Sequence, residues 1–221
     1  MKFLFSTVLL ICLSIGLTAP RSAEAQVLVM GDSVLTWNNW TREGSVPEIL
    51  QNRYGFRVVD RAVPGSGFFK GHNGGASVPN QFKPGAWRAV VINGGANDLL
   101  SFCGCKVCDE VLDRLITTDG KSGSYADLLN RIDGPVILVG YYGLIRGGGG
   151  SAYDACADET AELARRLKSV ADKDTDIHFI SLRRAFNGNR KYYHTDFTHP
   201  SQAGTNLIAK LVVDKLREIR R

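Results

Sequence analysis

Short runs of β-branched and apolar residues alternate along the chain with stretches of helical periodicity, and this alternation constrains the fold more than any other feature. The runs predict five strands, at residues 26–30, 57–62, 89–93, 135–141 and 177–182. Apolar residues at helical spacing predict helices over 46–53, 124–132, 153–171 and 200–217. Strands that alternate with helices need crossover connections, so the sequence predicts an α/β fold with a parallel sheet covered by helices.

The length and composition of the chain fit one globular domain. It has 221 residues, of which 44% are hydrophobic and 22% charged, which excludes a collagen, a coiled coil and a disordered chain. We find no internal repeat or interdomain linker, and we expect residues 26–221 to form a single domain. The net charge is +5, and without the first 25 residues it is +4, from 25 basic and 21 acidic side chains. A charge this small and scattered does not indicate a nucleic-acid-binding protein.

Residues 1–25 have the pattern of a secretory signal peptide. Lys2 precedes an apolar run over 3–17, and Ala23-Glu24-Ala25 forms a small-x-small cleavage site before Gln26. The alternative is a membrane anchor, but the run is shorter than the ~20 residues that a spanning helix needs. We therefore expect a secreted or periplasmic protein with no stable membrane insertion after cleavage.

Four cysteines remain after the leader: Cys103, Cys105, Cys108 and Cys156. An even number in an exported chain indicates two disulfides, although the first three also have spacing compatible with a zinc site. A Cys103–Cys105 bond would be strained. Two pairings remain open: Cys105–Cys108 with Cys103–Cys156, or Cys103–Cys108 with Cys105–Cys156.

Polar and glycine residues follow the first three predicted strands directly. Ser33 stands in Gly-Asp-Ser after the first strand, Gly65 follows the second, and Asn97 lies in Gly-Gly-Ala-Asn-Asp after the third. Each motif alone is also typical of a turn or a helix cap. Parallel strands end at one edge of the sheet, however, so the three residues are expected to meet there.

A second block lies near the end of the chain, where Asp196 stands three residues before His199. This spacing lets the carboxylate reach one imidazole nitrogen and leaves the other free to act as a base. His194, Asp196 and His199 are also metal-ligand types, but no further cluster completes a metal site. We expect neither a metal nor an organic cofactor.

These blocks occur in the order Gly31-Asp32-Ser33, Gly65, Gly95-Ala96-Asn97-Asp98 and Asp196-x-x-His199-Pro200, and together they resemble the SGNH/GDSL hydrolase family. The resemblance implies a flavodoxin-like, three-layer α/β/α domain with a five-stranded parallel sheet that hydrolyses acyl esters. It implies that Ser33 is the nucleophile, that His199 is the general base, and that Asp196 orients His199. It also implies an oxyanion hole made by the backbones of Ser33 and Gly65 and the amide of Asn97.

The sequence departs from the family pattern at two places. Val34-Leu35-Thr36-Trp37 replaces the commoner continuation of the first block, and Asp60-Arg61 replaces the usual asparagine of the second. Neither departure removes a catalytic group, but both leave the subfamily open.

The sequence thus predicts an exported serine esterase that acts on a small-molecule, polysaccharide or lipid ester, with acetylated polysaccharide and lipid esters as the two substrate classes. Trp37, Phe68 and Tyr142 are expected to border the crevice and contact the substrate. The alternative is a non-catalytic carbohydrate-binding protein on the same fold. The absence of any Gly-x-Ser-x-Gly elbow excludes a serine esterase of the α/β-hydrolase type.

Overall fold

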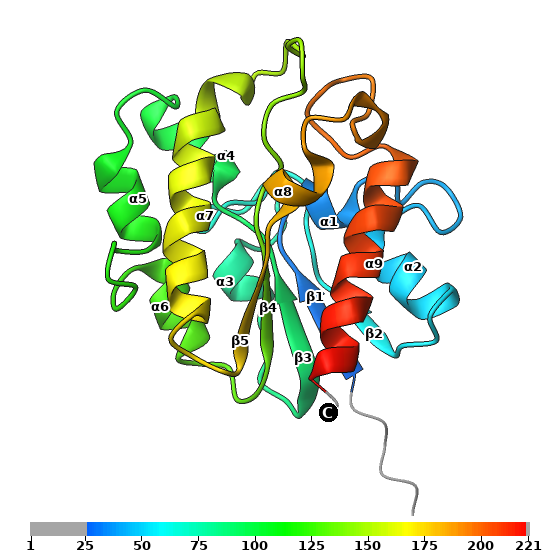
Figure 1. The fold of residues 1–221 in the computed structure, drawn as a ribbon. Helices are drawn as coiled ribbons and strands as arrows, with labels where there is room; N and C mark the ends of the chain where they lie inside the picture. Colours follow the sequence, from blue (N-terminus) through cyan, green and yellow to red (C-terminus); the bar gives the residue numbers. More distant parts are fainter. Residues whose placement is uncertain (1–25, 220–221) are drawn as a thin grey trace, which may run out of the picture.

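A computed structural model describes residues 26–219, which form a three-layer α/β/α domain (Figure 1). All five predicted strands are present and pair in parallel in the order β2-β1-β3-β4-β5. This is the flavodoxin-like order that the family resemblance implied. The strands are β1 (Gln26–Met30), β2 (Val58–Asp60), β3 (Trp87–Ile92), β4 (Val136–Val139) and β5 (Ile177–Ile180).

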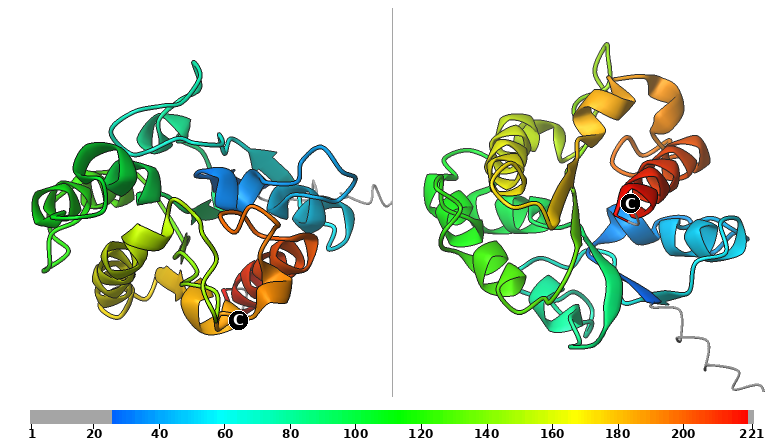
Figure 2. Two further views of the ribbon diagram at one scale, coloured as in Figure 1. Left: turned by 90° about the horizontal axis from the view of Figure 1, so that it is seen from above. Right: turned by 60° about the horizontal axis from the view of Figure 1, so that its bottom comes forward.

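Helices cover both faces of the sheet, as Figures 1 and 2 show. One face packs against α3 (Val78–Gln81), α4 (Ala96–Cys103), α5 (Asp109–Leu115), α6 (Ser124–Leu129) and α7 (Ala157–Ala171). The other face packs against α1 (Ser33–Thr36), α2 (Val46–Asn52), α8 (Leu182–Phe186) and α9 (Gln202–Glu218). Side chains of β1 alternate between the two cores, with Leu28 and Met30 in the first and Val27 and Val29 in the second. Apolar residues on both faces are what a covered parallel sheet requires.

The turn after β1 is fixed by Gly31. Its φ is +149°, and a Cβ there would lie 2.5 Å from the carbonyl oxygen of Asn93, the residue directly after β3, so only glycine fits. Asp32 then caps α1, since its carboxylate accepts from the Val34 N–H at 2.9 Å. The nucleophile candidate Ser33 therefore stands at the first position of a short helix at the carboxyl edge of the sheet.

Several helices were not predicted from the sequence. Among them are α4 and α5, which include or adjoin Cys103, Cys105 and Cys108. The N-caps of both helices, Gly95 and Cys108, make no side-chain capping hydrogen bond, so the usual signal at a helix start is missing. The predicted helix over 153–171 is divided into η1, a 3₁₀ turn over Asp154–Cys156, and α7.

The predicted signal peptide lies outside the described residues. No helix within residues 26–219 is long and apolar enough to cross a membrane.

Candidate active site

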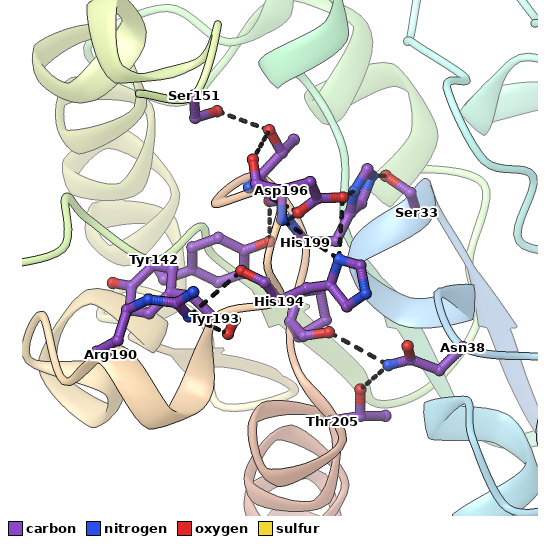
Figure 3. A network of polar contacts seen from close by, with 12 residues as sticks. Ser33, Asn38, Tyr142, Ser151, Arg190, Tyr193, His194, Asp196, His199 and Thr205 are labelled. Carbon is purple, nitrogen blue, oxygen red and sulfur yellow. Dashed lines mark hydrogen bonds and ion pairs between the residues drawn. The ribbon is translucent and has the colours of Figure 1, made fainter. Parts of the chain in front are cut away.

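Ser33, His199 and Asp196 form a hydrogen-bonded chain at the carboxyl edge of the sheet (Figure 3). His199 Nε2 lies 3.1 Å from Ser33 Oγ, and His199 Nδ1 lies 2.7 Å from Asp196 Oδ2. Ser33 begins α1, whereas Asp196 and His199 come from the loop before α9. The hydrogen bond between Ser33 and His199 therefore joins residues that are 166 positions apart in the sequence. This is the geometry in which a histidine can take the proton of a serine hydroxyl while a carboxylate orients the ring.

The carboxylate of Asp196 is held in its ionised form. Partial burial would raise the pKa of Asp196, but hydrogen bonds from the ring and backbone of His199 and the backbone of Thr198 lower it to about 2. The two backbone N–H groups both donate to Oδ1 at 3.0 Å. Oδ2 therefore stays directed at the imidazole, and Nδ1 carries the proton that it accepts.

Trp37 stacks directly on the ring of His199, with centroids 3.4 Å apart and planes within 5°. Burial lowers the pKa of His199, although the hydrogen bond and charge of Asp196 oppose that shift. The stacked indole contributes to this burial by excluding water from one face of the imidazole. Trp37 does not line the cavity at Ser33, so the structure places it behind the base instead of at the substrate contact that we had predicted.

Asn97 lies between the start of α1 and the loop of Gly65, the two segments that carry the other predicted oxyanion donors. Its Nδ2 donates to the carbonyl of Ser66 at 3.0 Å and more distantly to Asp32 Oδ2 at 3.3 Å. Ser66 is next to Gly65, and Asp32 is next to Ser33. Within residues 26–219 the backbone N–H groups of Ser33 and Gly65 donate to no other protein group, so both are free for a ligand oxygen.

Gly65 cannot be replaced by a larger residue without a change in the loop. It has a φ of +76°, and a Cβ would lie 2.7 Å from the ring of His72. The next part of this loop is held by the buried Asp98 of α4, whose carboxylate accepts from the N–H groups of Phe68 and Phe69 at 2.7 and 2.9 Å. One helix, α4, thus positions both the Asn97 amide and the Gly65 loop.

The predicted substrate contact by Phe68 is wrong. Its side chain is buried in the core beneath the loop, with its ring 4.0 Å from that of Tyr125. The hydrogen bond from its backbone to Asp98 turns the side chain inward, so that it anchors the loop. An aromatic residue in a glycine-rich loop does not reveal from sequence which way it faces.

Asp32 is fully buried beneath the nucleophile. Its Oδ2 accepts a short hydrogen bond from the hydroxyl of Tyr141, whose oxygen in turn accepts from the N–H of Ala96 at 3.1 Å. Burial raises the pKa of Asp32 to about 6, although the hydrogen bonds from Tyr141 and Val34 oppose the rise. Asp32 thereby connects the start of α1 to the start of α4, the two helices that present Ser33 and Asn97.

A cavity of about 60 Å³ opens beside Ser33. Tyr142, predicted as a substrate contact, does line it, and its hydroxyl donates to the carbonyl of Thr198 in the loop of the base. The rest of the cavity wall is made of both polar and apolar residues. It includes Asn97, Tyr141, Leu144, Ile145, Ser151, Tyr153, Ala157, Tyr193 and Phe197.

The four cysteines form two disulfides, Cys103–Cys108 and Cys105–Cys156, which is one of the two pairings that the sequence left open. The zinc alternative for these residues therefore does not apply to this structure. Over residues 26–219, no group of three or more His, Cys, Asp or Glu side chains is placed to hold a metal ion.

The hydrogen bonds that Tyr141, Ser151 and Tyr153 make in the site were not predicted from the sequence, although the loop over 141–151 was expected to border the crevice. Tyr153 donates to Asn97 Oδ1 at 2.6 Å, and Ser151 Oγ lies 2.7 Å from Thr198 Oγ1. Their partners are 47 to 109 positions away in the chain. No local spacing rule relates such pairs, so only the folded arrangement could reveal them.

The three-layer α/β/α fold and the arrangement of Ser33, His199 and Asp196 agree with the family that comparison with known proteins identifies. The model of the GDSL-like lipase/acylhydrolase family matches residues 29–207, so the chain belongs to that family and is a hydrolase of ester bonds. A search of curated proteins found no match.

Solved structures share the fold at low sequence identity. A member of the lipolytic G-D-S-L family from Veillonella parvula is 14% identical with a TM-score of 0.61, covering 86% of this chain and 97% of its own. A carbohydrate acetylesterase family member from Sinorhizobium meliloti is 16% identical with a TM-score of 0.54, covering 88% and 98%. A family two carbohydrate esterase from Clostridium thermocellum is 17% identical with a TM-score of 0.54, covering 88% and 64%.

Proposed function

We propose that the protein is an exported serine esterase that removes short acyl groups, acetyl foremost, from carbohydrate. The catalytic part of this proposal rests on the hydrogen bonds that join Ser33 Oγ to His199 and His199 to Asp196. The hydroxyl of Ser33 attacks the ester carbonyl while His199 Nε2 takes its proton. His199 then protonates the leaving alcohol, and in the second step it activates the water that releases the acid.

The negative charge that develops on the carbonyl oxygen needs hydrogen-bond donors that are already in place. The free N–H groups of Ser33 and Gly65 supply two of them. The third comes from Asn97 Nδ2, whose contact with Asp32 is long at 3.3 Å and can be exchanged for one with the oxyanion. Asn97 keeps its shorter bond to the Ser66 carbonyl as the fixed point of this movement.

The size of the cavity favours a short acyl group. Its volume of about 60 Å³ is far below the roughly 300–1,000 Å³ of pockets that enclose a drug-sized ligand. A long lipid chain would have to lie outside this space. Apolar atoms of Leu144, Ile145 and Ala157 line it beside the polar groups, which suits the methyl of an acetyl group.

An exposed tryptophan supports a sugar on the alcohol side of the ester. Trp40 is 62% exposed and lies edge-on to Trp37, with centroids 4.9 Å apart, while Trp37 stacks on His199. An exposed indole that adjoins the ring stacked on His199 offers a surface on which a sugar ring can pack. The printed descriptions of two structural neighbours, a carbohydrate acetylesterase family member and a family two carbohydrate esterase, agree with this substrate class.

Export is supported by the predicted leader and by the two disulfides, which are typical of oxidising compartments. The proposal predicts that expression with the leader yields a protein beginning at Gln26 outside the cytoplasm. N-terminal sequencing of that material tests the cleavage site.

Covalent labelling tests the nucleophile. An organophosphonate should label the wild-type protein once, at Ser33, and Ser33→Ala should be neither labelled nor active on p-nitrophenyl acetate. A series of p-nitrophenyl esters of increasing chain length, together with acetylated oligosaccharides, then ranks the substrates. A wild-type protein that binds the oligosaccharide but takes up no label would instead be the carbohydrate-binding protein that the sequence also allowed.

A further inference from the structure

Residues 151–156, which we call the strap, touch three separate parts of the active site. Ser151 Oγ contacts Thr198 Oγ1 at 2.7 Å (Figure 3). Thr198 belongs to the loop of Asp196 and His199 and directly precedes His199 in the sequence. Tyr153 donates its hydroxyl hydrogen to Asn97 Oδ1 at 2.6 Å. Cys156 is bonded to Cys105, which follows α4, the helix whose first turn holds Asn97. The strap therefore connects the loop of the base to the helix of the oxyanion donor.

The strap has a defined internal structure. The Asp154 carboxylate accepts from the N–H groups of Gly150 and Ser151 at 2.9 and 3.1 Å. The Tyr153 N–H donates to Ser151 Oγ at 3.1 Å, and the Cys156 N–H donates to the Tyr153 carbonyl at 2.9 Å. Because these bonds order the backbone, the position of the Tyr153 ring is set before any substrate arrives.

The hydrogen bonds of Asn97 divide between its two ends. On the nitrogen side, the Ser66 carbonyl and Asp32 carboxylate accept from Nδ2. On the oxygen side, the hydroxyl of Tyr153 donates to Oδ1. A hydrogen bond to an amide oxygen draws electrons through the amide, so the N–H on the other end becomes a stronger donor. Without it, the amide is held at one end only and can rotate about its last bond.

We propose, on the basis of the function above, that Tyr153 is a positioning residue for Asn97: it fixes and polarises the amide that faces the oxyanion. The strap carries Tyr153 to that place, with the Cys105–Cys156 bond and the Ser151–Thr198 contact as its two anchors. Tyr153 acts through Asn97 and not by proton transfer to the substrate.

The phenol of Tyr153 is suited to positioning Asn97 because it stays protonated. Burial, with a contribution from the charge of Asp32, raises the pKa of Tyr153 to about 12. Its hydrogen is therefore available to Asn97 over the whole pH range in which His199 works as a base.

Tyr153→Phe removes only the hydroxyl and keeps the ring. We expect kcat on p-nitrophenyl acetate to fall about tenfold and KM to stay within about twofold, since the lost effect appears in the transition state. Tyr54→Phe is the matched control, because Tyr54 packs near Arg217 at the far end of α9. In an Asn97→Ala background the same Tyr153→Phe change should have no further effect.

Three kinetic results would overturn the proposal. The first is an unchanged kcat in Tyr153→Phe. The second is a raised KM with unchanged kcat, which would place Tyr153 on the substrate. The third is an equal loss with and without Asn97, which would show that Tyr153 does not act through it.

A second, independent test of the proposal does not require enzymatic activity. The side-chain amide signals of Asn97, identified by NMR from their loss in Asn97→Ala, should shift and exchange faster with water in Tyr153→Phe but not in Tyr54→Phe. Unchanged signals would refute the positioning role. If the wild-type protein hydrolysed no ester, the proposed function would fail, while this measurement would still decide whether Tyr153 positions Asn97.

Discussion

Burial and the neighbouring Asp196 shift the pKa of the proposed base, His199, in opposite directions. Burial lowers the pKa of its imidazole, and the hydrogen bond and charge of Asp196 raise it. The neutral ring is the active form, so kcat/KM should rise with pH to a plateau, with a midpoint below the ordinary imidazole value. In Asp196→Asn the opposing influence is removed, so the midpoint should move further down while the plateau falls by at least tenfold. Rate profiles over pH 4–9 measure both, and a midpoint that moved up would contradict this account.

Trp37 contributes to the burial of the same ring. Its indole covers one face of His199, and its own Nε1 is buried without a hydrogen-bond partner among residues 26–219, so its contribution is contact and not hydrogen bonding. Trp37→Ala would admit water to the imidazole, so the midpoint of kcat/KM should move up towards the ordinary value. Trp40→Ala is the control, since Trp40 touches Trp37 and not His199. It should leave the midpoint in place and raise KM for acetylated oligosaccharides alone.

At the scale of elements, the strap is held by one disulfide and bordered by another. Cys105→Ala with Cys156→Ala should free the strap, lower kcat severalfold and expose the segment 147–153 to proteolysis. Cys103→Ala with Cys108→Ala removes a bond that joins the end of α4 to the start of α5 and leaves the strap tied. That pair should keep kcat near the wild-type value. Equal losses in the two double variants would argue against the strap as a distinct element.

The elements that sequence could predict are those with a long or strong pattern. All five strands carry β-branched runs, and α2, α7 and α9 carry clear apolar periodicity. The elements that it missed are short, such as α1 and α3 with four residues each, or lack a capping side chain, such as α4. In such helices tertiary packing decides the conformation more than local propensity does.

The same distinction applies to the candidate site. Ser33, Asn97 and the Asp196–His199 pair were found because each follows a strand or has a local spacing with chemical meaning. Hydrogen bonds join Ser33, His199 and Asp196, and Asn97 lines the same cavity as Ser33; the catalytic roles of these residues await the experiments above. The direction of aromatic side chains was not predictable, since burial of a ring depends on which helices pack above it.

At the scale of the whole molecule, the two disulfides should differ in their effect on stability. On the chain-entropy model, the bond across 51 positions contributes about 4 kcal/mol and the bond across 5 positions about 2 kcal/mol. Urea unfolding of the two double variants should therefore show about twice the loss for the Cys105–Cys156 pair. A larger loss for the Cys103–Cys108 pair would show that the entropy of the unfolded chain is not the main term.

The buried Asp32 couples the stability of the entire domain to pH. Its pKa is about 6 in the folded protein against 3.8 for an exposed aspartate, so the unfolded chain loses this proton first as the pH rises. Stability from this group is therefore greatest below pH 4, falls between pH 4 and 6, and is constant above, with a total loss on the order of 3 kcal/mol.

Asp32→Asn should remove that dependence, because the amide carries no charge and does not titrate. Its one oxygen can take the place of Oδ1 and accept from the Val34 N–H, while its NH2 group takes the place of Oδ2 and faces the Tyr141 hydroxyl, which must then accept. The difference in unfolding free energy between variant and wild type should thus shift in favour of the variant by about 3 kcal/mol from pH 3.5 to pH 7.5. Other carboxylates titrate in both proteins and cancel in this difference. A difference that did not vary with pH would show that the pKa of Asp32 is the same in the folded protein and in the unfolded chain, so that the hydrogen bonds from Tyr141 and Val34 offset the effect of burial fully.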